Sequence, residues 1–243
     1  MTAIASALEL FGKALRQGAA GAAIALASSF FALGALFGES GLTLMQSAAF
    51  SVFTFALPGQ LVAAQLYSGG AGALAIVAAV LFVNARLAPM TVSLLPLLRP
   101  ARERSALDFI LAHWIAVTSW VFFMGTYREV REEDRLRWFA LAGLFFWLAG
   151  VCATIGGYLA GALLPRYLLL GLLFLNPAYF LYMMLRSLTR QSDALAMLAG
   201  MILLPPMHYL LPEWDILAAG VVGGTIIFVI SRRKPQQPKT APE

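Results

Sequence analysis

Eight long apolar runs occupy most of the sequence and restrict the folds that it can adopt. They lie approximately at residues 18–38, 45–67, 72–97, 107–126, 138–163, 166–186, 194–211 and 214–231, each bounded by charge, glycine or proline. A helix of about 20 apolar residues crosses a hydrocarbon core roughly 30 Å thick. The runs therefore predict an all-α polytopic membrane protein with about eight transmembrane helices.

The composition supports a chain embedded in the lipid bilayer. Hydrophobic residues make up 60% of the 243 residues and charged residues only 12%, too few to cover a water-soluble core. The net charge of +5 does not point to nucleic acid, because lysine and arginine lie in short loops between the apolar runs. We expect one transmembrane domain over residues 1–231, with a short interfacial helix at 3–16, and a disordered cytoplasmic tail at 232–243.

The basic loops also predict the orientation of the chain. With eight crossings and both termini in the cytoplasm, most lysine and arginine residues fall on the inner side, as the positive-inside rule requires. The inner loop 127–137 mixes both signs of charge, which is typical of a solvated connector or a docking surface. The loop 99–105 carries three arginines on the outer side, so a broken or re-entrant segment before it is the alternative to a full crossing.

Proline and glycine interrupt several of the predicted helices. The interruptions are LPGQ at 57–60, Pro89 and Pro96 in the third run, LNPAY at 175–179 and LLPPM at 203–207. Proline frees a carbonyl in the preceding turn, and that carbonyl needs a partner inside the protein. Each site is either an ordinary kink or a break of the kind from which transporters build binding sites near the membrane midplane.

Arg86 is the charged residue that most needs an explanation. It lies about 21 Å along its predicted helix, counting from Gly72, and a charge at that depth costs between about 3 and 15 kcal/mol. Among the apolar runs, the acidic residues are Asp108 in the first turn of the fourth and Asp215 at the start of the eighth, so none lies at the depth of Arg86. The partners that remain for Arg86 are freed carbonyls, water, a carboxylate of a second subunit, or the carboxylate of a substrate. A structural staple and a role on a transport pathway are both open.

Polar residues near the other breaks complete a candidate binding site. Gly59 opens a half-helix whose free N–H groups can receive an anion, and a break near Pro89 would bring Asn84 and Arg86 to one cavity. The candidate substrate-binding residues are Arg86, Asn84, Gln60, Gly59, Pro58 and Asn176.

His113, about six residues into the fourth run, is either a hydrogen-bonded core residue or a proton carrier. The histidine, cysteine and carboxylate positions show no metal-ligand spacing and no catalytic triad. We therefore expect neither an enzyme nor a cofactor.

Two blocks of the sequence resemble the AzlC-type branched-chain amino-acid permease family. In that family a glycine-and-glutamine motif precedes a helix with an Asn-x-Arg signature and an LxPxLR-like end. Residues 50–99 match this pattern at Gly59, Gln60, Asn84 and Arg86 and in LLPLLR, which ends at Arg99. Residues 137–180 look like the family's tryptophan- and glycine-rich helix followed by its P…LGLDF…F segment.

The resemblance implies a proton-coupled exporter of branched-chain or other hydrophobic amino acids in the bacterial cytoplasmic (inner) membrane. It also implies a small AzlD-type membrane subunit as partner. Many members carry an acidic pair early in the fourth span, where this chain reads LAHWIAV at 111–117, so the coupling residue is missing or replaced by His113. The usual GLDF is GLLF at 171–174. The rival interpretation is a non-transporting membrane scaffold or biogenesis subunit.

Overall fold

The computed structural model describes residues 9, 12, 20–98, 107–187, 191–210 and 215–232. Every regular element in these ranges is a helix, which confirms the predicted all-α class. The chain divides into two compact units, Met1–Phe180 and Leu181–Glu243. The predicted single domain stays a prediction. The predicted interfacial helix at 3–16 and the tail at 232–243 lie outside the described residues, apart from residues 9, 12 and 232.

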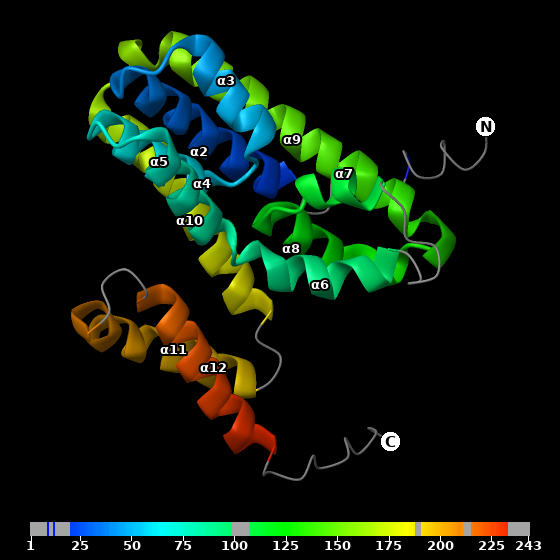
Figure 1. Ribbon diagram of the computed structural model, residues 1–243. Coiled ribbons are helices and arrows are strands. Elements are labelled where there is room, and N and C mark those ends of the chain that lie inside the picture. Colours follow the sequence, from blue (N-terminus) through cyan, green and yellow to red (C-terminus); the bar gives the residue numbers. More distant parts are fainter. Residues whose placement is uncertain are drawn as a thin grey trace. The chain divides into compact units, whose positions relative to one another are not determined.

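Two long helices, α2 (Ala20–Glu39) and α9 (Arg135–Ala160), form the centre of the first unit (Figure 1). The Gly157 backbone lies against the Phe31 carbonyl, and Gly161 lies against Ala35 one turn further along both helices. The two helices therefore run in the same direction. Small residues let their backbones approach this closely, as expected for glycines spaced four apart. In the predicted topology these helices are the first and fifth crossings, and two odd-numbered crossings run in the same direction through the membrane.

Three of the predicted spans are each made of two short helices. These pairs are α3 (Leu44–Phe53) with α4 (Leu57–Ser68), α5 (Ala73–Asn84) with α6 (Leu87–Leu98), and α7 (Leu107–His113) with α8 (Val117–Thr126). The α5–α6 pair bends by 52° at its break. A 3₁₀ turn, η3 (Tyr127–Glu129), follows α8, another, η4 (Glu132–Asp134), precedes α9, and a third, η5 (Gly161–Leu163), follows α9.

The first two breaks lie a few residues before the prolines that predicted them. Pro58 stands in the first turn of α4, and the break is at residues 54–56. Pro89 likewise stands in the first turn of α6, so the break predicted near it lies at Ala85 and Arg86 instead. A proline is tolerated in the first turn because no intrahelical partner awaits its N–H there. Each break therefore comes before its proline.

At the other prolines, including Pro96 in α6, the helix continues, which leaves the kink as the alternative that fits, and one break was not predicted. The helix α10 (Arg166–Ser187) continues through Pro177, and in the second unit α11 (Gln191–Leu210) continues through Pro205 and Pro206. A proline kink persists in a continuous helix when its freed carbonyl finds another partner. The α7–α8 break has no proline near it. In the second unit, α11 packs against α12 (Asp215–Arg232), with Gly223 against the Leu203 side chain.

The helix lengths identify the clearest candidates for crossing a membrane. Two stretches, Ala20–Glu39 and Glu132–Leu163, are long and apolar enough by themselves, and the α5–α6 pair adds a third if it counts as one span. The chain is thus a membrane protein by length and composition, while the count of about eight crossings stays a prediction.

Candidate functional site

A buried polar network holds the break between α3 and α4. Gln60 is 0% exposed, and both the oxygen and the nitrogen of its side-chain amide form hydrogen bonds. Its Oε1 accepts a hydrogen bond from Ser51 Oγ at 3.0 Å, and its Nε2 donates to the Thr54 carbonyl. Ser51 Oγ in turn lies 2.8 Å from Thr154 Oγ1 on α9. Gln60 therefore braces the break from within α4.

The last turn of α3 is held from two further helices. The Val52 carbonyl, which has no partner in its own helix, lies 2.8 Å from His113 Nε2 and accepts from Trp147 Nε1 at 3.1 Å. Because a carbonyl oxygen only accepts, the Nε2 atom of His113 carries the proton in this contact. His113 thus links the end of α7 to the end of α3.

Glycines on α9 make room for two of the breaks. A Cβ on Gly150 would lie 3.1 Å from the Phe55 ring in the α3–α4 break. A Cβ on Gly143 would lie 2.8 Å from the Trp114 Cβ in the α7–α8 break. Seven residues are about two helical turns, so the two breaks lie against one face of α9. Gly143, Gly150 and Gly157 are spaced seven residues apart. This spacing is the sequence signal that would have predicted the face of α9 against which the breaks pack.

Ser119 completes the α7–α8 break without any proline. Its Oγ donates to the Trp114 carbonyl at 2.7 Å and accepts from the Ala116 N–H at 2.9 Å. A serine at this position satisfies the donor that the start of a helix leaves free. Sequence reasoning missed this break because the capping serine lies after it, inside an apolar run.

Asn84 and Gly59 bring the end of α5 to the start of α4. A Cβ on Gly59 would lie 2.6 Å from Asn84 Oδ1 and 2.8 Å from Asn84 Nδ2, so only glycine leaves room for the amide. Pro58, beside Gly59 in the same turn, has no N–H to donate. Asn84 is half-buried, and its Oδ1 is buried without a hydrogen-bond partner among the described residues. An acceptor that needs a donor thus lies at the start of a half-helix.

Arg86 lies in the two-residue turn between α5 and α6. Its side chain is half-buried, and within the described part of the chain its Nε has no hydrogen-bond partner. The ion pairs that described residues form with one another, Arg131 with Glu133 and Arg135 with Glu132, lie in the loop before α9. Arg86 therefore presents a buried donor two residues from the Asn84 acceptor, at the sharpest bend of the span.

Asn176 lies in a separate contact network between α10 and α2. Ser29 Oγ donates to the Leu172 and Leu173 carbonyls, each at 3.0 Å, and accepts from the Asn176 N–H at 3.3 Å. Leu173 is four residues before Pro177, so its carbonyl is the one that the proline leaves without a helical partner. Asn176 is 6% exposed, and its Oδ1 has no hydrogen-bond partner in the described ranges.

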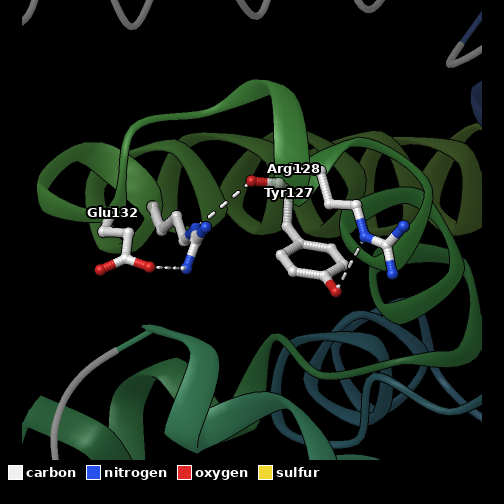
Figure 2. A network of polar contacts seen from close by, with 4 residues as sticks. Tyr127, Arg128 and Glu132 are labelled. Atoms are coloured by element: carbon white, nitrogen blue, oxygen red, sulfur yellow. Dashed lines mark hydrogen bonds and ion pairs between the residues drawn. The ribbon is translucent and has the colours of Figure 1, made fainter.

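The charged loop before α9 is paired within itself (Figure 2). Arg135 donates to the Tyr127 carbonyl and to Glu132 Oε1, both at 3.3 Å, and Arg128 Nε donates to the Tyr127 hydroxyl at 3.3 Å. This hydrogen bond raises the pKa of Arg128. The pairing supports the connector interpretation of the loop. The hydrogen bonds of Arg128 and Arg135 are made within the loop and not to the helix breaks.

Comparison of the sequence with known proteins identifies the family of the chain. A protein-family model described as AzlC protein matches residues 22–164, more than half of the chain. The matched region runs from the first turn of α2 to just after η5 and contains all three breaks, whereas Asn176 lies beyond it. No curated protein and no solved structure matched the chain. The chain therefore belongs to the AzlC family, and its function is related to membrane transport.

Proposed function

We propose that the chain is a secondary transporter that exports branched-chain or other hydrophobic amino acids across the bacterial inner membrane. The observation that carries the proposal is the position of Arg86 in the α5–α6 bend, with a buried Nε that has no partner among the described residues. A guanidinium binds a carboxylate through strong, charge-assisted hydrogen bonds. The carboxylate of an amino acid supplies the partner that Arg86 needs at this depth.

The neighbouring groups suit the rest of a zwitterion. Asn84 Oδ1 is a buried acceptor without a partner in the described part of the chain, and an ammonium group is a donor. The Gly59 backbone in the first turn of α4 packs against this amide, and the dipole of α4 favours the negatively charged carboxylate at that end of the helix. An Arg86 donor and an Asn84 acceptor are the two polar groups that the zwitterion of an amino acid requires.

The remaining predicted site residues take different parts in this proposal. Pro58 and Gly59 shape the start of α4, and Gln60 holds the break that positions it, since both ends of its amide are used inside the protein. Asn176 adds a second buried acceptor from α10. Only Arg86, Asn84 and Asn176 are proposed to contact the substrate through their side chains.

His113 is the proposed proton carrier, and its contact with Val52 supports Nδ1 as the atom that takes up the proton. Because Nε2 donates to the Val52 carbonyl, the free position for an added proton is Nδ1. Protonation there would keep the Nε2 donor and thus the link between α7 and α3. His113 could then carry a proton while its hydrogen bond to the Val52 carbonyl, next to the α3–α4 break, is kept.

The resemblance also supports a small AzlD-type membrane subunit as partner of this chain. The test is efflux from proteoliposomes that contain the chain with and without the neighbouring small subunit. We expect Arg86→Ala to lose transport and Arg86→Lys to keep a part of it, because lysine retains the charge but not the fork of donors. The control is Arg128→Ala, which removes an exposed arginine of the loop.

Two results would contradict the proposal. Full transport in both Arg86 variants would exclude Arg86 as the carboxylate ligand. Absence of flux of any amino acid under any gradient, with and without the small subunit, would favour the non-transporting scaffold.

A further inference from the structure

Three backbone groups of α10 meet at one hydroxyl of α2. The Pro177 ring removes the N–H that would have bonded the Leu173 carbonyl, and Ser29 Oγ donates to that carbonyl at 3.0 Å instead. The same Oγ lies 3.0 Å from the Leu172 carbonyl and accepts from the Asn176 N–H at 3.3 Å. Ser29 thus replaces the regular helical bonding in the turn that carries Asn176.

The side chains at this junction are almost fully buried. Ser29 is 0% exposed and Asn176 is 6% exposed. Nearly all buried polar groups in folded proteins are hydrogen-bonded, but Asn176 Oδ1 has no such partner within the described part of the chain. The backbone of Asn176 is therefore held firmly while its side-chain acceptor is left for another donor.

We propose that Ser29 is a positioning residue, which holds Asn176 so that its Oδ1 accepts a hydrogen bond from the substrate's ammonium group. This inference rests on the proposed transport function and deepens it by adding α10 to the groups that recognise the ammonium group, in addition to Asn84. This role requires the hydroxyl group of Ser29. Alanine at position 29 would leave the Leu173 carbonyl without its donor, and the turn before Pro177 would relax.

The first test is a double-mutant cycle in the intact transporter. We expect Ser29→Ala to raise KM for the amino acid about fivefold with Vmax nearly unchanged, the effect of misplacing one hydrogen bond. In an Asn176→Ala background, Ser29→Ala should change KM no further, because its effect passes through Asn176. Independent, additive effects of the two substitutions would overturn the proposal.

Ser47→Ala is the matched control for loss of a buried serine hydroxyl. Ser47 is also 0% exposed, but among the described residues its Oγ bonds only to the Thr43 carbonyl, at 2.9 Å and within its own segment. We expect this variant to keep the KM of the parent protein. A rise in KM equal to that of Ser29→Ala would show a general packing effect and overturn the positioning role.

A second measurement needs no transport. In a Cys152→Ser background, which removes the single cysteine of the chain, Asn176→Cys is labelled with a thiol reagent. We expect Ser29→Ala to speed labelling at least about twofold by loosening the turn, and Ser47→Ala to leave it unchanged. Equal labelling rates with and without Ser29 would contradict the proposal. If no variant transports any amino acid, the proposed function fails, while the labelling rates still decide whether Ser29 positions residue 176.

Discussion

The side-chain amide of Asn84 lies directly against the backbone of Gly59, where a Cβ would come within 2.6 Å of its Oδ1. This contact joins the last residue of α5 to the first turn of α4. Arg86 follows two residues later, in the turn where α5 and α6 bend by 52°. The candidate site is therefore built where two half-helices meet, and its shape depends on a residue without a side chain.

Gly59→Ala should disrupt this contact. The added methyl group needs the space of the Asn84 amide, so we expect a loss of about 1–3 kcal/mol in stability and a fall in transport of at least about tenfold. Thermal unfolding in detergent and proteoliposome efflux measure the two effects. Gly72→Ala is the control, because a Cβ there meets nothing within 4 Å. Adding Asn84→Ala should restore stability but not transport; restored transport would show that Asn84 is not a ligand.

Substrate analogues should separate the two ends of the zwitterion. The parent protein should bind an amino-acid ester, which lacks the carboxylate, far more weakly than the amino acid, because Arg86 is left unpaired. Arg86→Ala should remove most of that preference, reducing it by about 1.5–3 kcal/mol in competition assays. An unchanged preference in Arg86→Ala would place the carboxylate elsewhere.

His113→Gln distinguishes proton carriage from a structural role. Glutamine can still donate to the Val52 carbonyl but cannot titrate near neutral pH. If His113 carries the proton, the variant should fold normally and lose the dependence of efflux on the pH gradient. The control is Trp147→Phe, which removes the other donor to Val52 and should affect stability alone. A parental pH profile in His113→Gln would make the histidine structural.

Gln60→Leu should weaken the α3–α4 break. Leucine leaves Ser51 Oγ and the Thr54 carbonyl without their amide partner inside a largely buried network, at a cost of about 2–4 kcal/mol. The change should appear as a lower Tm in detergent. Gln65→Leu, on an exposed position of the same helix, should leave Tm within experimental scatter. If the two variants match in Tm, Gln60 does not brace the break.

Gly157→Ala and Gly156→Ala form a matched pair that tests the close contact of α2 with α9. A Cβ at 157 would overlap the Phe31 carbonyl, whereas a Cβ at 156 would make an ordinary contact with the Phe31 ring at 3.8 Å. We expect Gly157→Ala to destabilise the protein by about 2 kcal/mol or more and Gly156→Ala by little. Equal stability of the two variants would mean that the helices pack in another register.

Several features followed directly from the order of residues. Apolar runs of sufficient length predict helices, and the spacing of Gly157 and Gly161 predicts close packing, because both depend on local geometry and periodicity. Arg86 could also be singled out from the sequence, because the free-energy cost of a charge depends on its depth in an apolar run. The structure confirms the helices and the close packing at Gly157 and Gly161, whereas the role of Arg86 stays a prediction.

The places where the helices break depended on partners from elsewhere in the chain. Pro177 did not interrupt α10 because Ser29, on a helix far away in sequence, supplies the missing hydrogen bond. The α7–α8 break, in contrast, has no proline and depends on Ser119 and on the space beside Gly143. A local pattern shows which backbone groups a residue frees, but not which distant group meets them.

The sequence by itself determined the helical class and the membrane setting and marked Arg86 and Asn84 as candidates, because hydrophobicity and charge act at the level of single segments. Only the tertiary structure decided that Asn84 meets Gly59, that both ends of the Gln60 amide are used within the protein, and that Ser29 holds the turn of Asn176. Each of these depends on which helices pack side by side, and a hydrogen bond or a close contact exists only when both partners are in place.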